Sequence, residues 1–552
     1  MTSQDQVNQL IRRHTTLKND RVYWEAELWS PAMDFCQPQA GSMQSNNTRQ
    51  SGELRGQKVY DGTPEWACDV LVNGMYSGLT PDNYKWFKWS VTPEWLNDDP
   101  QVKSYLQQCE EITYQALSES NYSESTLGVY RQQAVYGTGC KYIEYDPQKI
   151  LNFQRIRLTN VCIAEDRSGK IDTIFREFKW SARNAVKQWG NRCPTIIRNA
   201  VESGNHDTEF DFLHVVYPRE DYIHGKRDRQ NMPFASLWLY QAEKKILDEG
   251  GYLSFPFSVP RWDREDDVPW GRGPAIKALQ DMGVLNQQGK TNLIAAHKMV
   301  EPPLAIPEDG FNKAIDLSPG GFNYYNPTRG EIRPIMSSIN LPFAVDMQDR
   351  TQKAVERRFF VDVFLMLTEN PKMTATEVLE RKQEKLVILG PTIGQQRREH
   401  LDNDLDRVFE ILNENGHFPD PPEILLQYGN KIKTEYVSPL AMAQRRIEVE
   451  STMRVYQVAG NIVQLTGRTD AIDVLNDEET IRLIADRESA PVEIMKTREQ
   501  VQAEREAKQQ QMEDMQAMQE AAAMTQGAKD LGGIKTDQPN VLTDVAKGLT
   551  GE

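Results

Sequence analysis

Apolar residues recur at helical spacing near both ends of this chain, and alternating patterns fill much of the stretch between them. In residues 1–35, 64–78 and 100–135 the apolar positions return every three or four residues, which is typical of helices with one buried face. From 136 to 260 the period shortens toward two, which predicts strands between turns. The predicted strands cover 139–145, 153–158, 171–178, 212–217 and 235–240. We expect an α+β fold with a mostly antiparallel sheet, interrupted by one helix at 181–203.

Two long helices are predicted after residue 260, with a small β-rich segment between them. A glycine turn and a first-turn proline at 270–274 predict a helix that runs to about Val300, where two prolines end it. Pro342 opens the second helix, which we expect to continue to about Leu367. Residues 304–341 are rich in proline, glycine and aromatic residues, with a strand candidate at 331–335. The arrangement predicts a stalk with a small tip.

A tight loop and a strongly specified helix start follow the second long helix. Thr374 and Glu377 match a capping box, in which each side chain accepts from the other residue's amide. We expect this third helix to be interrupted and kinked at Gly390 and Pro391, because proline removes a backbone hydrogen bond. Helical patterns return at 440–488 and at 492–524, where a methionine and alanine stripe includes Met512, Met515, Met518 and Ala522.

Length and charge limit the classes of protein that this chain can represent. With 552 residues, three or four domains or subdomains are expected. The net charge of −16 disfavours tight binding of nucleic acid, because phosphate neutralisation needs basic surfaces, but it permits transient passage of DNA. The N-terminus has no signal-peptide pattern, and no apolar run approaches the ~18 residues of a membrane-spanning helix. We expect a soluble, cytoplasmically folded chain that does not engage membranes.

The six cysteines are widely spaced, without a C-x-x-C pair, and all lie in the first 200 residues. This usage predicts reduced, buried thiols rather than disulfides.

The seven histidines are scattered without metal-ligand spacing. Gly271 and Gly273 are too few for a dinucleotide fingerprint, and we interpret residues 137–139 as a hairpin-type turn.

Two clusters allow a chemical interpretation beside a purely structural one. Asp263, Glu265 and Asp266 have the ligand type for a divalent metal, which allows a metal-dependent nuclease, but we favour a solvated loop. The aromatic stretch at 84–95 has the composition of a base-stacking platform, yet few basic residues accompany it. We therefore favour a strand whose aromatic side chains are packed between elements.

Charges on the second long helix allow two interpretations. Asp346 and Arg350 are four residues apart, as are Asp349 and Lys353, and both pairs have the spacing of intrahelical ion pairs. A helix with this mixed surface either lies against copies of itself in a ring or faces solvent alone. The segment by itself does not decide between the two.

The order of these elements resembles the portal, or head-to-tail connector, proteins of tailed bacteriophages, closest to those of short-tailed, podovirus-type phages similar to T7. The similarity rests on residues 270–274 before the first long helix and on the apolar helix end at 359–367. It rests also on Met-Thr-Ala-Thr-Glu-Val at 373–378 and on the Gln/Met/Ala-rich C-terminus. The resemblance implies the following domains: an α+β wing at 1–269, stem helices at 270–303 and 342–367, a clip at 304–341, a tunnel loop at 368–373, a kinked wing helix at 374–419, a helical crown or barrel at 420–526 and a flexible tail at 527–552.

The resemblance implies a structural role without catalytic residues, cofactor or metal. Such proteins form rings of twelve subunits at one capsid vertex of the virion, assembled in the host cytoplasm. Their rings conduct double-stranded DNA and dock the terminase and later the tail adaptor and tail tube proteins. They also contact the major capsid and scaffolding proteins during procapsid assembly. The open alternative is another structural component of the virion or tail.

The resemblance also implies roles for particular residues. Glu369, Asn370 and Lys372 of the tunnel loop are expected to face the DNA channel, and Lys290 and Lys298 on the first stem helix are further candidates for the lumen. The candidate clip contacts are Phe322, Tyr324, Tyr325 and Arg329, and the candidate inter-subunit charges on the second stem helix are Asp346, Asp349, Arg350 and Lys353.

Overall fold

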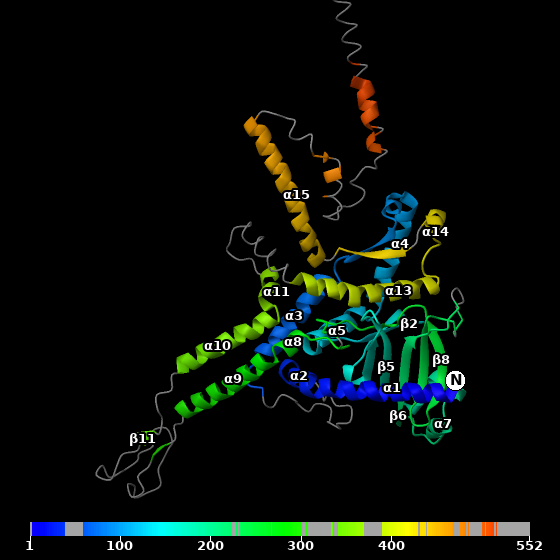
Figure 1. Cartoon of the computed structure of the whole chain (residues 1–552), viewed down its shortest axis with the longest axis vertical. Coiled ribbons are helices and arrows are strands. Elements are labelled where there is room, and N and C mark those ends of the chain that lie inside the picture. Colours follow the sequence, from blue (N-terminus) through cyan, green and yellow to red (C-terminus); the bar gives the residue numbers. More distant parts are fainter. Residues whose placement is uncertain are drawn as a thin grey trace, which may run out of the picture. The chain divides into compact units, whose positions relative to one another are not determined.

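The structure is a computed structural model that describes most of the first 466 residues and parts of the remainder. The described ranges are 3–38, 59–223, 228–229, 231–266, 268–300, 304–305, 333–334, 341–368, 389–428, 431–437 and 439–466, with short pieces between 475 and 515. Contacts divide the chain into two compact units, Met1–Ile447 and Glu448–Glu552. The first unit holds the described sheets and the long paired helices (Figure 1).

Helices dominate the N-terminal part of the first unit, as the apolar spacing predicts. They are α1 (Ser3–Trp24), a π-helical turn (Glu25–Trp29), α2 (Ser30–Cys36), α3 (Thr63–Leu79), α4 (Pro100–Glu119) and α5 (Tyr122–Tyr136). The single helix predicted at 100–135 is wrong, because the chain leaves helical geometry at Ser120 and Asn121. The side chain of Asn121 exchanges two hydrogen bonds, each 2.9 Å long, with the backbone of Phe153. This contact holds the break in place.

Two antiparallel sheets confirm the α+β class. The larger sheet has the order β4-β5-β6-β7-β8, with β4 at Val161–Glu165, β5 at Ile171–Ser181, β6 at Glu209–Pro218, β7 at Phe234–Tyr240 and β8 at Lys245–Tyr252. The smaller sheet has the order β3-β2-β9, with β2 at Lys141–Asp146, β3 at Ile150–Arg155 and β9 at Phe257–Ser258. The alternating pattern predicted β2, β3, β5, β6 and β7, but not the edge strands β4 and β8. Charged residues and two glycines obscure the alternation in β8.

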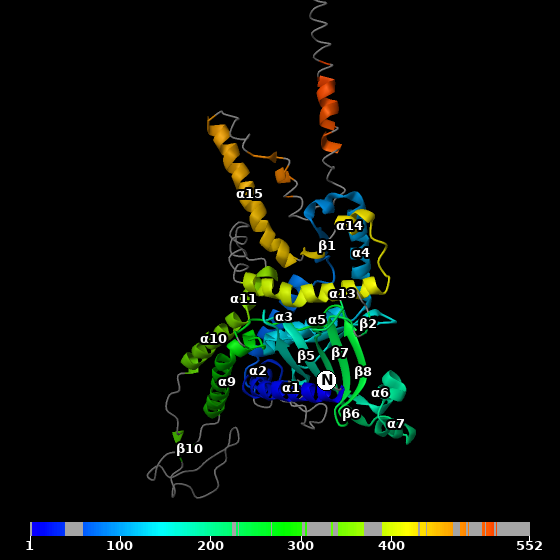
Figure 2. The same ribbon diagram turned by 45° about the vertical axis from the view of Figure 1, so that its right-hand side comes forward.

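Helices cover both faces of the larger sheet (Figure 2). Val7 and Leu10 of α1 pack against Phe175 and Leu213 on one face. On the other face, Phe212 lies against two short helices, α6 (Ala182–Trp189) and α7 (Thr195–Glu202). These replace the single helix expected at 181–203, because the turn at Gly190, with φ +51°, separates them. The six cysteines are buried free thiols, as predicted.

The aromatic stretch at 84–95 contains a strand with one buried face. β1 (Phe87–Thr92) pairs antiparallel with β12 (Lys431–Tyr436). Trp86 and Trp89 are buried, which confirms the packing interpretation for them, whereas Trp95 is exposed. Residues 431–436, predicted within a helical region, are therefore a strand, because pairing with a strand some 340 positions earlier overrides their local pattern.

The two long helices are α9 (Leu279–Val300), preceded by the short α8 (Pro274–Lys277), and α10 (Leu341–Arg358). Pro274 occupies the first turn, as predicted. The second helix does not reach Leu367 unbroken: it ends at Arg358, and α11 (Val361–Thr368) begins after a two-residue turn. Between α9 and α10, the described residues form one short pairing of β10 (Leu304–Ala305) with β11 (Arg333–Pro334), within the predicted strand at 331–335.

The helix expected after the tight loop is described from residue 389 onward. Residues 389–396, which include Gly390 and Pro391, are helical, but the residues before Leu389 lie outside the described part of the chain, so the predicted interruption stays a prediction. Further along, the backbone departs from α geometry at a π-helical turn, Arg397–Leu401, before α13 (Asp402–Glu414) and α14 (Glu423–Tyr428). The predicted capping box of Thr374 and Glu377 lies outside the described residues.

The C-terminal helix α15 (Pro439–Thr466) begins in the first unit and extends into the second, which starts at Glu448. It confirms the helix predicted from residue 440, as far as Thr466. Met512 and Met515 of the predicted stripe are exposed, and Met518 and Ala522 lie outside the described residues. None of the helices in the described part of the chain combines the length and apolarity that a membrane span requires.

Candidate functional site

The long helices α9 and α10 lie side by side and are fastened by polar side chains. Asn292 Nδ2 donates to Gln348 Oε1 at 2.7 Å. Gln348 and Gln352 both donate to Oδ2 of Asp61, at 2.8 and 2.9 Å, and the Thr63 amide donates to its Oδ1. Burial alone would raise the pKa of Asp61, but these hydrogen bonds outweigh it and lower the pKa. An ionised carboxylate therefore ties α10 to the start of α3.

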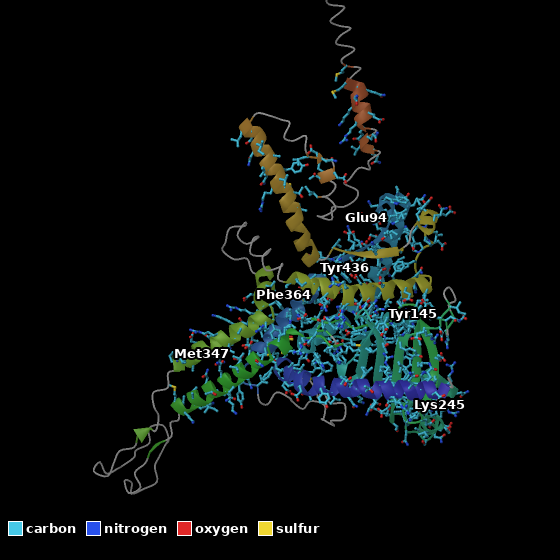
Figure 3. The ribbon with its side chains drawn as sticks, viewed as in Figure 1. Glu94, Tyr145, Lys245, Met347, Phe364 and Tyr436 are labelled. Carbon is cyan, nitrogen blue, oxygen red and sulfur yellow. The ribbon has the colours of Figure 1, made fainter. Side chains whose placement is uncertain are left out.

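Several apolar side chains on the paired helices are exposed in the part of the chain that the structure describes. Leu293 and Val300 of α9 are 49% and 82% exposed, and Val345 and Met347 of α10 are also exposed. Figure 3 labels Met347 on α10. Single exposed apolar residues are ordinary, but several on two adjacent helices make this surface a candidate for contact with another protein.

The two lysines predicted to face a channel lie exposed on α9. Lys290 Nζ is 5.9 Å from the centroid of the Tyr60 ring, within the range of a cation–π contact. Lys298 lies in the last turn of the helix. Asp281 is the one acidic residue of α9, so this helix does not share the acidic excess of the chain. A lumen-facing position for the lysines stays a prediction.

The charges on α10 are paired only in part. Arg350 and Asp346 form the expected i,i+4 ion pair at 2.9 Å, with both side chains more than half exposed. Within the described residues, Asp349 and Lys353 do not form the matching pair that their spacing predicts. Exposed ion pairs gain little free energy in water, so spacing alone does not secure them.

The other predicted contact residues lie outside the described part of the chain. They are Glu369, Asn370 and Lys372 of the expected tunnel loop, and Phe322, Tyr324, Tyr325 and Arg329 of the expected clip.

The short helix α11 is docked on α3 through a glycine. A Cβ on Gly74 would lie 2.2 Å from the ring of Phe364, so only glycine admits this ring. Phe364 is buried at this contact and is labelled in Figure 3. In the turn before α11, Phe359 is fully buried and Phe360 has a φ of +55°. Left-handed backbone is unfavourable for an aromatic residue, so the surrounding packing must hold this turn.

Residues 259–273, here called the junction segment, connect the smaller sheet to α8 and are pressed against the end of α5. A Cβ on Gly137 would lie 2.2 Å from the Gly271 carbonyl oxygen, and the Trp262 amide donates to the Gly137 carbonyl at 2.8 Å. Gly137, with φ +79°, is the C-cap of α5. The hairpin-type turn predicted at 137–139 is therefore wrong, and the glycines serve a close approach of two backbones.

Arg261 of the junction segment is buried between two carboxylates. Its backbone amide and guanidinium all donate to Glu399 in the π-helical turn, at 2.7 to 3.1 Å. The guanidinium also pairs with Glu165 and donates to the Gly169 carbonyl at 2.9 Å. Burial alone would lower the pKa of Arg261, but the two carboxylates outweigh it and raise the pKa. The arginine thus joins the β4–β5 turn, the junction segment and the π-helical turn.

A second buried ionic cluster joins β2 to α13. Lys141 of β2 pairs with Asp404 of α13, and both side chains are fully buried. Lys141 Nζ also donates to Thr126 Oγ1 at 3.1 Å, and His400 Nε2 lies 3.5 Å from Asp404 Oδ2. Burial lowers the pKa of Lys141 and raises that of Asp404, and burial beside Lys141 holds the pKa of His400 well below its usual range. These residues fix the register of α13 against the small sheet.

Comparison of the sequence with known proteins assigns the chain to a family. The profile described as "Bacteriophage head to tail connecting protein" matches residues 7–495. The chain belongs to this bacteriophage connector family. It is 28% identical over 547 residues to "Portal protein" of Salmonella phage epsilon15, covering 97% of each chain. It is 29% identical over an aligned length of 568 residues to "Probable portal protein" of Bordetella phage BPP-1, covering 100% of each. The resemblance to phage portal proteins is confirmed.

Members of this family are structural connectors between the head and tail of the virion. The acidic cluster of this connector fits such a role better than metal chemistry. Asp263 pairs with Lys277, and Glu265 pairs with Arg272 at 2.5 Å. In the described residues, no group of three potential ligands is arranged to hold a metal ion. The cluster serves the junction segment as a set of ion pairs.

Sequence reasoning did not identify the buried charges of this connector. Arg261, Lys141 and Asp404 have no local signal, because only long-range packing brings them together. One signal for the π-helical turn was present. The buried residues Ile393 and Leu401 are eight positions apart, whereas two turns of α-helix take about seven. The extra residue keeps both side chains on one buried face.

Proposed function

We propose that this connector forms a closed ring of twelve copies that surrounds a channel for double-stranded DNA. The observation that carries the proposal is the set of exposed apolar side chains on α9 and α10 in a chain of this family. One face of the helix pair then packs against a different face of the next copy. Such a head-to-tail interface makes a ring when its rotation closes. Asp346, Asp349, Arg350 and Lys353 exchange charges at the edge of this interface.

The ring conducts DNA during packaging and ejection without trapping it. The net charge of −16 keeps phosphate contacts weak. Tight binding of DNA is driven by the release of counterions, which needs many basic side chains close together. Lys290 and Lys298 provide transient phosphate contacts along the channel. Glu369, Asn370 and Lys372 line its narrowest part, with Lys372 the one cation among the three.

The partners follow from the place of a connector in the virion. The ring lies at one vertex of the capsid, assembles in the host cytoplasm with the major capsid and scaffolding proteins, and first binds the terminase. Tail adaptor and tail tube proteins take the place of the terminase after packaging. Phe322, Tyr324, Tyr325 and Arg329 are the proposed contacts for these partners.

Imaging of the purified full-length chain by negative-stain electron microscopy tests the ring. We expect closed rings with a central opening wide enough for a DNA duplex, and twelve subunits by native mass spectrometry. Open filaments, or monomers at micromolar concentration, would contradict the ring. A closed ring with another subunit number would correct only the count.

A further inference from the structure

Two neighbouring residues of the junction segment contact two turns that lie before and after residues 361–396. Arg261 binds Glu399 in the π-helical turn that follows this range. Trp262, the next residue, is buried with its ring centroid 6.2 Å from that of Phe360, in the turn that precedes α11. One dipeptide therefore contacts a turn on each side of this range.

Both contacts fall on irregular backbone. Phe360 has the left-handed φ of +55°, and the 397–401 turn is π-helical. Each backbone conformation costs free energy and persists only where the surrounding contacts stabilise it. Arg261 and Trp262, which are adjacent in the junction segment, contact these two irregular turns. The same short stretch of chain therefore stabilises both.

The support itself is rigidly placed. The Trp262 amide is bonded to the Gly137 carbonyl, and the Arg261 carbonyl accepts from Gln396 Nε2 at 3.3 Å. From the other end of the segment, the Gly271 amide donates to Thr138 Oγ1 at 2.8 Å, shortly before the chain enters α8 and α9. Because the same segment continues into α8 and α9, it joins the base of α9 to Arg261 and Trp262.

We propose that Arg261 and Trp262 form a coupling joint, which makes the turn at Phe360 and the turn at Glu399 move together when the base of α9 moves. The joint has two states: one in which both irregular turns are held, as in this structure, and one in which both relax toward regular helix. Any effect of this joint on a DNA channel rests on the proposed function. The coupling between the two turns does not.

The test is hydrogen exchange measured by mass spectrometry on the full-length protein. Trp262→Leu removes the ring contact to Phe360, and Glu399→Gln removes a charge from the Arg261 bond. Each variant is expected to speed amide exchange about threefold to tenfold in both 355–366 and 389–401. Acceleration in the near turn alone would overturn the joint, because a purely local contact gives that result.

Matched controls separate coupling from general loosening. Trp189→Leu removes a tryptophan that is 7% exposed, against 5% for Trp262, and that packs in the cluster of α6 and α7. Glu177→Gln neutralises a carboxylate with 21% of its side chain exposed, against 22% for Glu399. Both are expected to leave the two turns unchanged. Equal acceleration in these controls would also overturn the proposal.

A second variant covers the case in which Trp262→Leu fails to fold. Phe360→Gly suits the positive φ and deletes only the ring that meets Trp262. It is expected to speed exchange at 389–401, and unchanged exchange there would overturn the joint. Exchange is read whether or not the protein forms rings, so a failure of the joint and a failure of the proposed channel give different results.

Discussion

The body of the first unit and the paired helices α9 and α10 place their side chains in opposite ways. In the body, charged groups such as Lys141 and Asp404 are fully buried and paired, and the large apolar side chains surround them. On α9 and α10, apolar side chains such as Leu293 and Val300 face outward, and polar groups such as Asn292 hold the helices together.

In the proposed ring, the difference separates what folds a single copy from what joins copies. The body pairs buried charges such as Lys141 and Asp404 within one chain. The paired helices are held in place by a few polar contacts, and several of their apolar side chains are exposed. Substitutions in the body should therefore change the stability of the chain, and substitutions on the exposed helix faces should change assembly.

The largest effect is expected from breaking the buried ion pair. Asp404→Leu leaves the Lys141 amine unpaired inside the protein, and we expect a loss of about 3–5 kcal/mol in the free energy of unfolding. Urea denaturation followed by circular dichroism measures this loss. The double variant Lys141→Met with Asp404→Leu should recover most of it. A single variant within 0.5 kcal/mol of the parent, on the order of ordinary surface changes, would contradict the prediction.

A smaller effect is expected from pH at a buried histidine of the body. His214 is fully buried, stacked on Trp238 and bonded to Ser236, and burial beside Arg176 holds its pKa well below its usual range. The folded state keeps His214 neutral while the unfolded chain takes up a proton below about pH 6.5. Stability should therefore fall, by at most about 1.4 kcal/mol per pH unit, as pH drops below that value.

Urea midpoints at pH 7.5, 6.5 and 5.5 measure the contribution of His214. His214→Gln should flatten the slope below pH 6.5, whereas His297→Gln, on the exposed face of α9, should leave it unchanged. Identical slopes in the parent and in His214→Gln would show that His214 does not contribute.

The smallest effect on stability is expected on the paired helices. Leu293→Asp adds a charge to an exposed site, so the free energy of unfolding of the single chain should change by less than about 0.5 kcal/mol. Assembly into rings should nevertheless be lost, because an unpaired carboxylate would be buried between copies. Size-exclusion chromatography with light scattering checks this result against Leu426→Asp, an exposed leucine of α14. Rings of the Leu293→Asp variant would place this face outside the interface.

The fold was predictable where local patterns were strong. The helices at 3–24 and 63–79, the start of α8 at Pro274 and most central strands follow from apolar spacing and proline position. The predictions failed where a distant contact decided the outcome. Asn121 breaks a helix through β3, β12 becomes a strand by pairing with β1, and the second long helix ends before Phe360.

The candidate site was predicted only in outline. The paired helices were anticipated, as was the Asp346–Arg350 pair, whereas the lumen-facing position of Lys290 and Lys298 stays a prediction. The residues that hold the helices to the body were not, since Asp61, Arg261 and Glu399 are ordinary polar residues until the fold brings their partners close.

By itself, the sequence of this connector determined the α+β class, most of its helices and central strands, and the family to which it belongs. Those properties depend on periodicity and on short motifs, which any local stretch of chain carries. Only the tertiary structure decided which charges are buried together and where the long helices break. A buried ion pair or a left-handed phenylalanine is stable only when groups far apart in sequence satisfy it. The contacts of Arg261 and Trp262 belong to this second class.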